Sequence, residues 1–482
     1  MGVVSFDLSV PLPLEPRQWQ SRLIQLLRQR MAQPVGSGHD VLVHAGPGAG
    51  KTLGALLGVW RLRQERQLQH YLVFCHRTAI AAQWRQAAAR VGLELGDWSD
   101  TDQTPLPTGQ GMLLSYQAAA LHQERLLTLL QGWGASPWLA IADEAHHLGV
   151  DPDDPDAAAW GQAFTTLTQS ARLRLGLSGT PFRADQLAFC AARRIQVRDG
   201  SGISERIVPD LCVEPRQLID AGDVRPLEFR FQDGWVDHAR VDGDPERSCL
   251  SAEDRECWRA RNLRRAIRLG DQHGIALRVL LGARRALERV REQHPGCGGL
   301  VIARDIAHAR RIAQLLEEQG DQAMLVHSMD PEAQDHLLAF QQGQGDWLVS
   351  IDMCSEGFDA PRLRVVAYLS TVVTRSRFVQ AITRAVRLDG QGGRDEPIPR
   401  HPSFVFAPAD PLLIRHARSW SISEPYLLRS NPELTAEAQG SGGRWSSQQP
   451  LAAVADGAGG LIELGGPQLP AFLSTAPRKR SA

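Results

Sequence analysis

The sequence predicts an α/β protein built from two parallel β-sheets, each with helices on both faces. Between residues 41 and 183, short apolar runs of strand length alternate with longer segments of helical periodicity. The same alternation returns between residues 298 and 387. Gly and Pro are frequent (44 and 29 residues) and aromatic residues make up only 6% of the chain, which suits a fold with many turns. Because strands that alternate with helices form parallel sheets, the two series predict two α/β domains.

Net charge and cysteine usage limit the possible classes of protein. The 482 residues leave room for several domains, and the formal net charge is −1, so any contact with a polyanion must come from local patches. The seven cysteines include no C-x-x-C pair, which argues against zinc, iron–sulfur clusters and disulfides and for a reducing compartment. The N-terminus shows no signal peptide, and no run approaches ~18 apolar residues. We therefore expect a cytoplasmic protein without a membrane partner.

A glycine-rich turn follows the first apolar run, residues 41–44, and precedes a helical pattern. Its glycines let backbone N–H groups converge on phosphate oxygens, and the start of the helix favours negative charge. Lys51 would reach the terminal phosphates and Thr52 would hold Mg²⁺. Ala45 stands where the usual G-x-x-x-x-G-K-[ST] pattern begins with glycine. The predicted phosphate-binding residues are Ala45, Gly46, Pro47, Gly48, Ala49, Gly50, Lys51 and Thr52.

The lysine of this turn is unusual in the chain. Lys51 is the only lysine before Lys479, although arginines are frequent. A compact ammonium at this single place suggests that the planar guanidinium group of arginine would not fit there. The alternative is a chance glycine-rich turn before a helix, but the preceding strand and this lysine favour a phosphate site.

A second motif follows the apolar strand at residues 138–142, which runs into Asp143 and Glu144. Paired carboxylates at the end of a buried strand are costly unless a cation is present. With a phosphate-binding turn upstream, Asp143 is expected to orient the Mg²⁺ shell, and Glu144 to position and polarise the attacking water. An acidic turn at the surface is the alternative.

Polar residues at other strand ends are weaker signals. Gln20, at the start of an amphipathic helix upstream of the turn, can present its amide to an adenine edge. Ser178 and Thr180 follow another strand and would hydrogen-bond the acidic motif and sense the γ-phosphate. Ligands of open α/β sheets bind at the carboxyl ends of the strands. Taken singly, a glutamine at a helix start is usually a solvated surface residue, and polar residues at strand ends are more often ordinary loop residues.

The second series of strands is followed by a predicted helix over residues 376–387. Gln380, Arg384 and Arg387 are spaced i, i+4, i+7 and would share one face of that helix. Burying a glutamine and two arginines together is costly without an anion. A γ-phosphate would satisfy them, in the way that arginine fingers act in phosphoryl transfer. A surface helix with salt bridges is the alternative.

Together these motifs resemble those of superfamily 2 helicases. Gln20, residues 45–52, Asp143-Glu144-Ala145-His146 and Ser178-Gly179-Thr180-Pro181 are similar in order and spacing to the first RecA-like domain. Glu356-Gly357-Phe358-Asp359 and residues 380–387 resemble the fifth and sixth motifs of the second domain, with Thr383 where glycine is common. The Asp-Glu-Ala-His-His and Ser-Gly-Thr-Pro-Phe-Arg variants look like the DNA-oriented branch, which includes restriction-enzyme motor subunits and XPB-like and RadD-like proteins. The resemblance covers residues 16–408.

This resemblance implies two tandem RecA-like domains with ATP and Mg²⁺ in the cleft between them. The implied catalytic residues are Lys51, Asp143, Glu144, Gln380, Arg384 and Arg387, and Gly357 and Asp359 join the nucleotide-binding set. DNA, favoured over RNA, would lie across the strand ends of both sheets and be held through phosphates and sugars. The residues expected along its track are His76, Arg77, Ser115, Tyr116, His327, Ser328 and Ser355. An RNA helicase, a double-stranded-DNA translocase of a restriction, defence or repair complex, and a nucleotide-gated scaffold are the alternatives.

The expected domain division follows from these motifs. Residues 1–228 form the ATP-binding domain, 229–296 a connector with arginine-rich helices, 297–409 the second RecA-like domain, and 410–482 a C-terminal extension that is largely flexible from about 431. The connector helices, residues 258–269 and 275–292, would either meet phosphates or present solvated faces. The apolar segments of the extension would either dock a protein partner or stay disordered.

Overall fold

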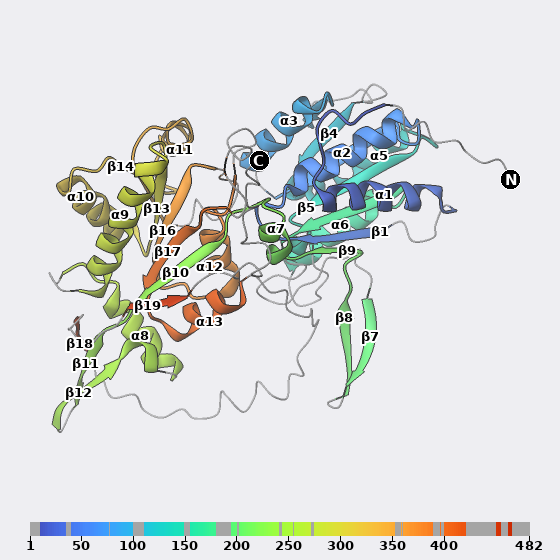
Figure 1. The fold of residues 1–482 in the computed structure, drawn as a ribbon. Coiled ribbons are helices and arrows are strands. Elements are labelled where there is room, and N and C mark those ends of the chain that lie inside the picture. Colours follow the sequence, from blue (N-terminus) through green and yellow to red (C-terminus); the bar gives the residue numbers. More distant parts are fainter. Residues whose placement is uncertain are drawn as a thin grey trace, which may run out of the picture. The chain divides into compact units, whose positions relative to one another are not determined.

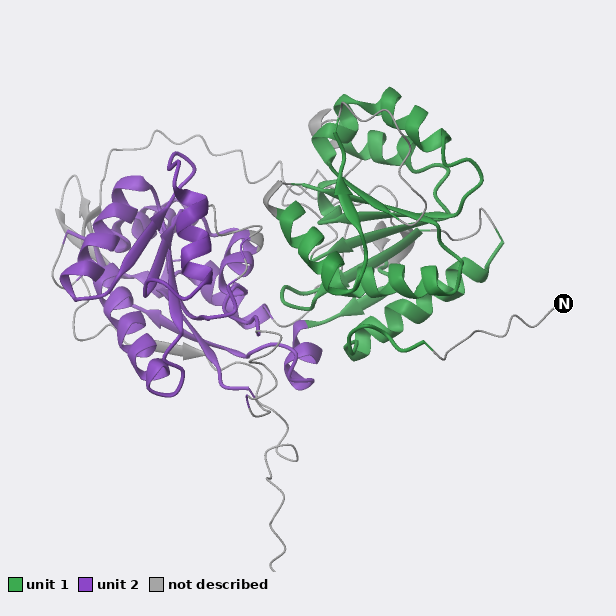
Figure 2. Ribbon diagram, turned by 90° about the horizontal axis from the view of Figure 1, so that it is seen from above, with its two compact units in different colours: residues 1–214, 424–441 green, residues 215–423, 442–482 purple. Residues whose placement is uncertain are grey.

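The computed structural model describes most of the chain, coloured from blue to red in Figure 1. The described residues are 10–34, 40–76, 78–99, 110–148, 155–179, 194–199, 202–240, 243–253, 255–270, 274–351, 358, 360–388, 396, 400–420, 450–454 and 461–464. The main chain divides into two compact units, with the change from unit 1 to unit 2 between Glu214 and Pro215 (Figure 2).

Unit 1 is built on a seven-stranded sheet in which all neighbouring strands are parallel. The strand order is β3-β4-β2-β5-β6-β1-β9. Its central strands are buried along almost their whole length, because helices cover both faces of the sheet (Figure 1). The strands are β1 (Asp40–Ala45), β2 (His70–Cys75), β3 (Leu95–Asp97), β4 (Gly111–Ser115), β5 (Trp138–Asp143), β6 (Leu173–Ser178) and β9 (Leu211–Val213).

The first two helices of unit 1 pack closely against each other. A Cβ atom at Gly54 would lie 2.9 Å from the ring of Trp19, so only glycine permits this approach. The contact brings the start of the first helix against the glycine-rich turn. The helices of unit 1 are α1 (Gln18–Ala32), α2 (Lys51–Gln64), α3 (Thr78–Arg90), α4 (Tyr116–Leu121), α5 (Gln123–Gln131) and α6 (Pro155–Leu167), and the antiparallel strands β7 (Arg194–Asp199) and β8 (Gly202–Ile207) form a separate ribbon.

Unit 2 contains a second seven-stranded sheet, of order β14-β15-β13-β16-β17-β10-β19. All neighbours are parallel except β19, which is antiparallel to β10. The strands are β10 (Leu227–Gln232), β13 (Gly298–Ala303), β14 (Ala323–Val326), β15 (Trp347–Ser350), β16 (Leu363–Leu369), β17 (Ser403–Pro408) and β19 (Leu461–Leu464). The helices are α7 (Pro215–Asp220), α8 (Glu256–Ala266), α9 (Ile275–Gln293), α10 (Ile306–Glu318), α11 (Ala333–Gln341), α12 (Arg375–Ile382) and α13 (Pro411–Ser419). Two parallel-sheet units with helices on both faces confirm the predicted fold class.

The boundary between the units differs from the expected one at residue 228, and residues 229–296 are not a separate connector. β10 lies inside the second sheet, where Leu227 to Gln232 pair in parallel with Ser403 to Pro408. α9 packs on β16 and β17, and its apolar face shares one core with them. The arginine-rich segment is therefore part of unit 2, because one face of α9 is apolar and completes that core.

Two segments of the C-terminal extension are strands. β19 adds an antiparallel edge to β10, with Phe229 opposite Leu464 and Gln232 opposite Leu461. β18 (Pro450–Val454) joins β11 (Trp235–Arg240) and β12 (Gly243–Cys249) in a small antiparallel sheet. The rest of the stretch from about 431 lies outside the described residues, so the expectation that it is largely flexible stays a prediction. Within the described part, none of the helices has the length and apolarity needed to cross a membrane.

Candidate active site

The glycine-rich turn connects the end of β1 to the first residue of α2. Gly50, the residue before the helix, has a φ of 78° and a ψ of 42°, a left-handed conformation that favours glycine. A Cβ atom there would also lie 3.0 Å from the side-chain nitrogen of Gln20. The first N–H groups of a helix have no partner within it, so the start of α2 presents donors suited to a phosphate.

Side chains of α1 and the residue before it hold the carbonyl groups of the turn. Arg17 Nη1 donates to the Gly48 carbonyl at 2.7 Å, and Trp19 Nε1 donates to the Ala49 carbonyl at 3.0 Å. Gln20 Nε2 donates to the Gly50 carbonyl at 3.0 Å. Three consecutive carbonyls are thus bound from one side, which fixes the conformation of the turn. Sequence reasoning missed Arg17 and Trp19, whose only signal was their position beside Gln20.

Gln20 has a structural role that the sequence did not indicate. Its side chain is 1% exposed, and its Oε1 accepts a hydrogen bond from the Arg17 backbone N–H at 2.9 Å. The amide therefore ties the start of α1 to the turn. Its predicted contact with adenine stays a prediction.

Lys51 and Glu144 face each other across this part of unit 1. Lys51 Nζ donates to the Ala45 carbonyl at 3.3 Å and lies 3.8 Å from Glu144 Oε1. Glu144 has a φ of 47° and a ψ of 52°, a left-handed conformation that is uncommon outside glycine and typical of functional turns. Its side chain is 30% exposed, so the carboxylate is accessible. The turn and the acidic motif are adjacent, as the sequence predicted.

Asp143 is the most perturbed carboxyl group of this site. It is 6% exposed, and its Oδ2 accepts a hydrogen bond from Trp84 Nε1 at 2.7 Å. Its Oδ1 accepts one from the Glu144 backbone N–H at 3.0 Å. Burial, followed by the negative charge of Glu144, raises the pKa of Asp143 to about 6. A buried carboxylate with a raised pKa gains from a cation, and Mg²⁺ commonly takes one or two carboxylates together with phosphates, so Asp143 fits the predicted Mg²⁺ site.

A hydrogen bond joins the acidic motif to the end of β6. His146 Nδ1 lies 2.9 Å from Ser178 Oγ, and Ser178 is fully buried. His146 Nδ1 also lies 3.4 Å from Glu144 Oε2. These contacts support the predicted coupling role of Ser178, and they add His146, which sequence reasoning had treated only as part of a motif. Thr180 lies outside the described residues.

The residues predicted to contact nucleic acid do not all lie at the surface. Tyr116 is 1% exposed and its hydroxyl donates to the Asp143 carbonyl at 2.5 Å, so its assignment to the track was wrong. Its ring belongs to the core of unit 1 and supports the acidic strand. Ser115 caps α4, accepting a hydrogen bond from Ala118 N at 3.0 Å. His76 is half-buried and its ring stacks on His147 at 4.1 Å.

In unit 2, the residues predicted to contact nucleic acid are likewise partly buried and partly exposed. His327 is largely buried and Ser328 is exposed, so only Ser328 is presented to solvent. Arg77, Ser355, Gly357 and Asp359 lie outside the described residues. The nucleic-acid track therefore stays a prediction, resting on the accessible members of the set.

The helix predicted over residues 376–387 ends early. α12 stops at Ile382, and Thr383 Oγ1 donates back to the Val379 carbonyl at 2.6 Å. Residues 384–386 form turns, so Gln380, Arg384 and Arg387 do not share one helical face. Arg384 is buried, and its Nη1 donates to the Phe358 carbonyl at 2.6 Å. Residues 383–387 are called the arginine segment below.

A buried arginine that sequence reasoning missed holds the arginine segment. The Arg225 backbone N–H donates to the Val386 carbonyl at 2.8 Å. Its Nη1 donates to the carbonyls of Arg387 at 2.5 Å and Pro361 at 3.0 Å. Its Nη2 pairs with Glu396 at 2.7 Å. Arg225 lies between α7 and β10, where the chain enters unit 2, so this entry point is bound to the backbone of the arginine segment.

Comparison with known proteins gives family matches over both units. A model described as the res subunit of type III restriction enzymes matches residues 13–183, and a helicase conserved C-terminal domain matches residues 282–389. An uncharacterized protein of Mycobacterium tuberculosis (strain CDC 1551 / Oshkosh) is 32% identical over 441 residues, which cover 88% of this chain and 66% of that protein. The chain thus spans just under two thirds of the length of that relative.

Solved structures share the fold at low sequence identity. A fragment described as the HsdR subunit of a type I restriction enzyme from Vibrio vulnificus YJ016 has a TM-score of 0.54 and 17% identity, covering 86% of this chain and 68% of that one. The type ISP restriction–modification enzyme LlaBIII, in a structure bound to DNA, has a TM-score of 0.52 and 13% identity, covering 86% of this chain and 30% of that one. Both likenesses concern the two-domain architecture.

Proposed function

We propose that the chain is an ATP-driven motor acting on DNA, of the restriction-enzyme-type branch of the superfamily 2 helicases, because a restriction-enzyme subunit model and a helicase C-terminal model match its two units. The two helicase domains imply ATP hydrolysis in general. The observation that carries the proposal is the arrangement at the ends of β1 and β5. There Lys51, at the start of α2, lies 3.8 Å from the carboxylate of Glu144, next to the buried Asp143.

Each residue of this arrangement has a proposed role. The turn before α2 binds the phosphates through backbone N–H groups, and Lys51 contacts the terminal phosphates. Thr52 and Asp143 would hold Mg²⁺, which when bound supplies positive charge to the phosphate oxygens. Glu144 orients the attacking water and accepts its proton. Arg384 and Arg387 of unit 2 would complete the site and stabilise the charge that develops on the γ-phosphate.

DNA is favoured over RNA by two features. The Asp-Glu-Ala-His-His and Ser-Gly-Thr-Pro-Phe-Arg sequences are similar to the DNA-oriented branch, and the matching family model is that of a restriction-enzyme subunit. The formal net charge of −1 predicts modest affinity that falls steeply with salt. We place the protein in the cytoplasm, where its scattered cysteines would remain reduced.

The Glu144→Gln variant tests the hydrolytic assignment. Losing the base is expected to lower kcat by a factor of about 10² to 10⁴ while ATP binding stays near the parent value, because the phosphate contacts remain. Steady-state ATPase assays and fluorescent-nucleotide titrations measure the two quantities. Glu124→Gln, at an exposed position of α5, is the matched control. Hydrolysis at the parental rate in Glu144→Gln would remove Glu144 from this role.

The polymer is tested by comparing ATPase stimulation by single-stranded DNA, forked DNA, duplex DNA and RNA. Greatest stimulation by single-stranded or forked DNA supports a DNA helicase, and greatest stimulation by RNA overturns the DNA assignment. The restriction-enzyme family match favours one second candidate, a translocase that moves along duplex DNA without separating it. Displacement of a triplex-forming strand without duplex unwinding would select that candidate.

A further inference from the structure

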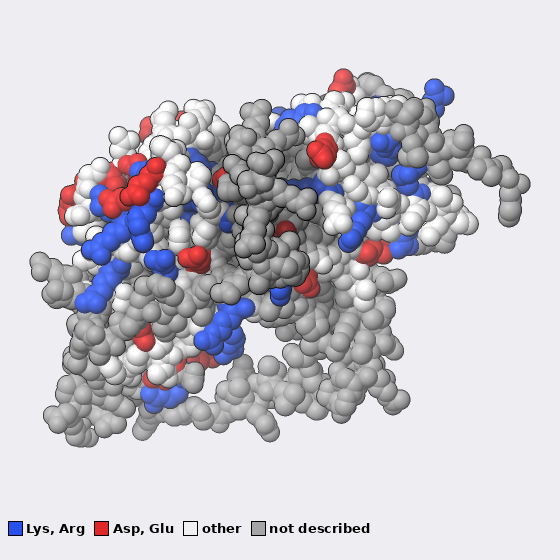
Figure 3. All heavy atoms as spheres, in the orientation of Figure 1, with Lys and Arg blue, Asp and Glu red and all other residues white. Residues whose placement is uncertain are grey.

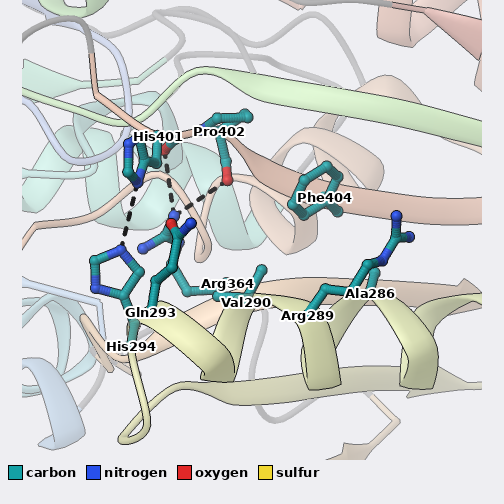
Figure 4. Close-up of a pocket in the computed structure, with 9 residues that line it drawn as sticks. All are labelled: Ala286, Arg289, Val290, Gln293, His294, Arg364, His401, Pro402 and Phe404. Carbon is teal, nitrogen blue, oxygen red and sulfur yellow. Dashed lines mark hydrogen bonds between the residues drawn. The ribbon is translucent and has the colours of Figure 1, made fainter.

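A cavity of about 210 Å³ lies in unit 2, between the last turns of α9 and the starts of β16 and β17 (Figure 4). Parallel α/β sheets bind their usual ligands at the carboxyl ends of the strands, whereas this cavity lies at the amino ends. Arg364 is the second residue of β16, and Phe404 is the second residue of β17. The cavity is therefore distinct from the proposed ATP site and from the expected nucleic-acid track.

Arg364, which lines this cavity, is buried with unsatisfied donors. Its side chain is 2% exposed. Its Nη2 makes two long hydrogen bonds, to the carbonyls of His401 at 3.4 Å and Pro402 at 3.2 Å. Within the described structure, its Nε and Nη1 have no nitrogen or oxygen hydrogen-bond partner, although the Cys297 thiol interacts with the guanidinium group. Unmade hydrogen bonds on a buried charged group cost free energy, so a partner for this guanidinium would stabilise the protein.

The charges around Arg364 do not balance within the described residues. Glu396 is the carboxylate that pairs with Arg364, at 3.8 Å from Nη1. The same oxygen of Glu396 lies 2.7 Å from Arg225, so one carboxylate serves two buried guanidinium groups. Burial raises the pKa of the neighbouring Cys297 thiol, which keeps that group neutral. Among the described residues, the guanidinium groups of Arg364 and Arg225 therefore share one carboxylate, which lies closer to Arg225.

Further basic groups surround the same space. His294 Nε2 lies 3.5 Å from His401 Nδ1, beside Arg364. Arg289 lies at the other end of the cavity (Figure 4). Val290 and Phe404 lie between the two ends. Where Figure 1 draws α9 and α10, Figure 3 shows basic side chains next to acidic ones. Burial, and then the positive charge of Arg364, lower the pKa of His294.

We propose that this cavity binds a phosphate-type oxyanion, placed against Arg364 and His294, with Arg289 at the opposite end. A guanidinium group matches the geometry of phosphate oxygens, and its Nε and one Nη suit bidentate binding. The exposed Gln293 and His401 lie beside Arg364 in Figure 4, so an anion would reach the guanidinium group once these side chains rotate. The volume admits inorganic phosphate or a small phosphomonoester whose organic part runs past Phe404.

Titration of the His294 ring by NMR tests the proposal, because this signal reports on the cavity and not on the phosphate-binding turn of unit 1. The protein with labelled histidine is titrated with inorganic phosphate and, separately, with glycerol phosphate, at constant ionic strength set with sodium chloride. We expect a saturable shift of the His294 signal and a higher His294 pKa, since a nearby anion stabilises the imidazolium. Binding of phosphate alone indicates a small-anion site; tighter binding of the ester indicates that Phe404 and Val290 contact its organic part.

Three variants test whether phosphate binds in this cavity. Arg364→Gln is expected to abolish the saturable shift. If that variant does not fold, two exposed positions of α9 decide: Arg289→Ala should weaken binding about threefold, and Arg285→Ala, one turn earlier and outside the cavity, should leave it unchanged. The absence of a saturable shift with both probes, or equal weakening by Arg289→Ala and Arg285→Ala, overturns the proposal.

Discussion

The glycine-rich turn of unit 1 and the arginine segment of unit 2 are held in place by different kinds of contact. In unit 1, Arg17, Trp19 and Gln20 bind three carbonyls of the turn that lie about thirty residues later in the chain. The arginine segment is bound by Arg225, which is more than 150 residues away in sequence. The first arrangement is local and closes around a helix start; the second depends on a long-range contact. The comparison suggests that the turn is preformed within unit 1, whereas the geometry of the arginine segment depends on how the chain enters unit 2.

Among the variants that test this difference, Arg225→Met is expected to change ATPase activity most. Loss of the bonds to the Arg387 and Pro361 carbonyls should shift the arginine segment and lower the kcat for ATP by a factor of about 10 to 100. The KM for ATP should change little, because the glycine-rich turn proposed to bind the phosphates belongs to unit 1. Steady-state ATPase kinetics separate the two parameters.

Arg259→Met is the control for the general loss of stability that is expected when Arg225 is replaced. Arg259 forms a comparable buried ion pair in unit 2, with Asp410 at 2.8 Å, away from the arginine segment. Both variants should lower the thermal midpoint, since each removes the guanidinium group that lies nearest to a largely buried carboxylate, that of Glu396 or that of Asp410. If the two variants lowered kcat equally, Arg225 would have only a structural role.

A medium effect, on pH dependence, is expected from Trp84→Phe in unit 1. Asp143 must be ionised to hold a cation, so with a pKa of about 6 its function should be lost as the pH falls through that value. Removing the Trp84 hydrogen bond takes away a contact with the charged form worth about 1.5–3 kcal/mol, which raises the pKa by about one unit or more. The acidic limb of ATPase activity at limiting Mg²⁺ should move to higher pH by that amount. An unchanged or acid-shifted limb would contradict the role assigned to Trp84.

The smallest effect, on ATP affinity, is expected from Arg17→Ala, which tests how the glycine-rich turn is held. It removes one of the three hydrogen bonds to the turn, so we expect a loss of about 1 kcal/mol and an ATP affinity weaker by roughly fivefold. Nucleotide titration gives the affinity. Arg28→Ala, which breaks the α1 ion pair with Glu65 away from the turn, serves as the control and should bind ATP like the parent. Equal weakening in both variants would mean that α1 acts through its general packing.

Much of the candidate site in unit 1 could be predicted because its residues follow buried strands. Parallel strands bring their carboxyl ends to one edge, so Lys51 and Glu144 were expected to meet, and they lie 3.8 Å apart. Tyr116 also follows the end of a strand, but its side chain points into the core, where its hydroxyl donates to the Asp143 carbonyl. Position at a strand end thus indicated the edge of the sheet but not the direction of the side chain. Arg225 had no local signal, because its partners lie far along the chain.

Local sequence signals were enough to predict the α/β class, the glycine-rich turn and the acidic strand end, because hydrophobic periodicity and turn residues act over a few neighbouring positions. Tertiary structure alone decided that β10 belongs to the second sheet, that α12 ends at Ile382, and that Leu461–Leu464 forms an edge strand. Each of these outcomes depends on which distant segment supplies the hydrogen bonds and apolar contacts. From the sequence, an arginine before a proline, such as Arg225, is predicted to be an ordinary loop residue. The structure shows backbone carbonyls of distant residues bound to its guanidinium group.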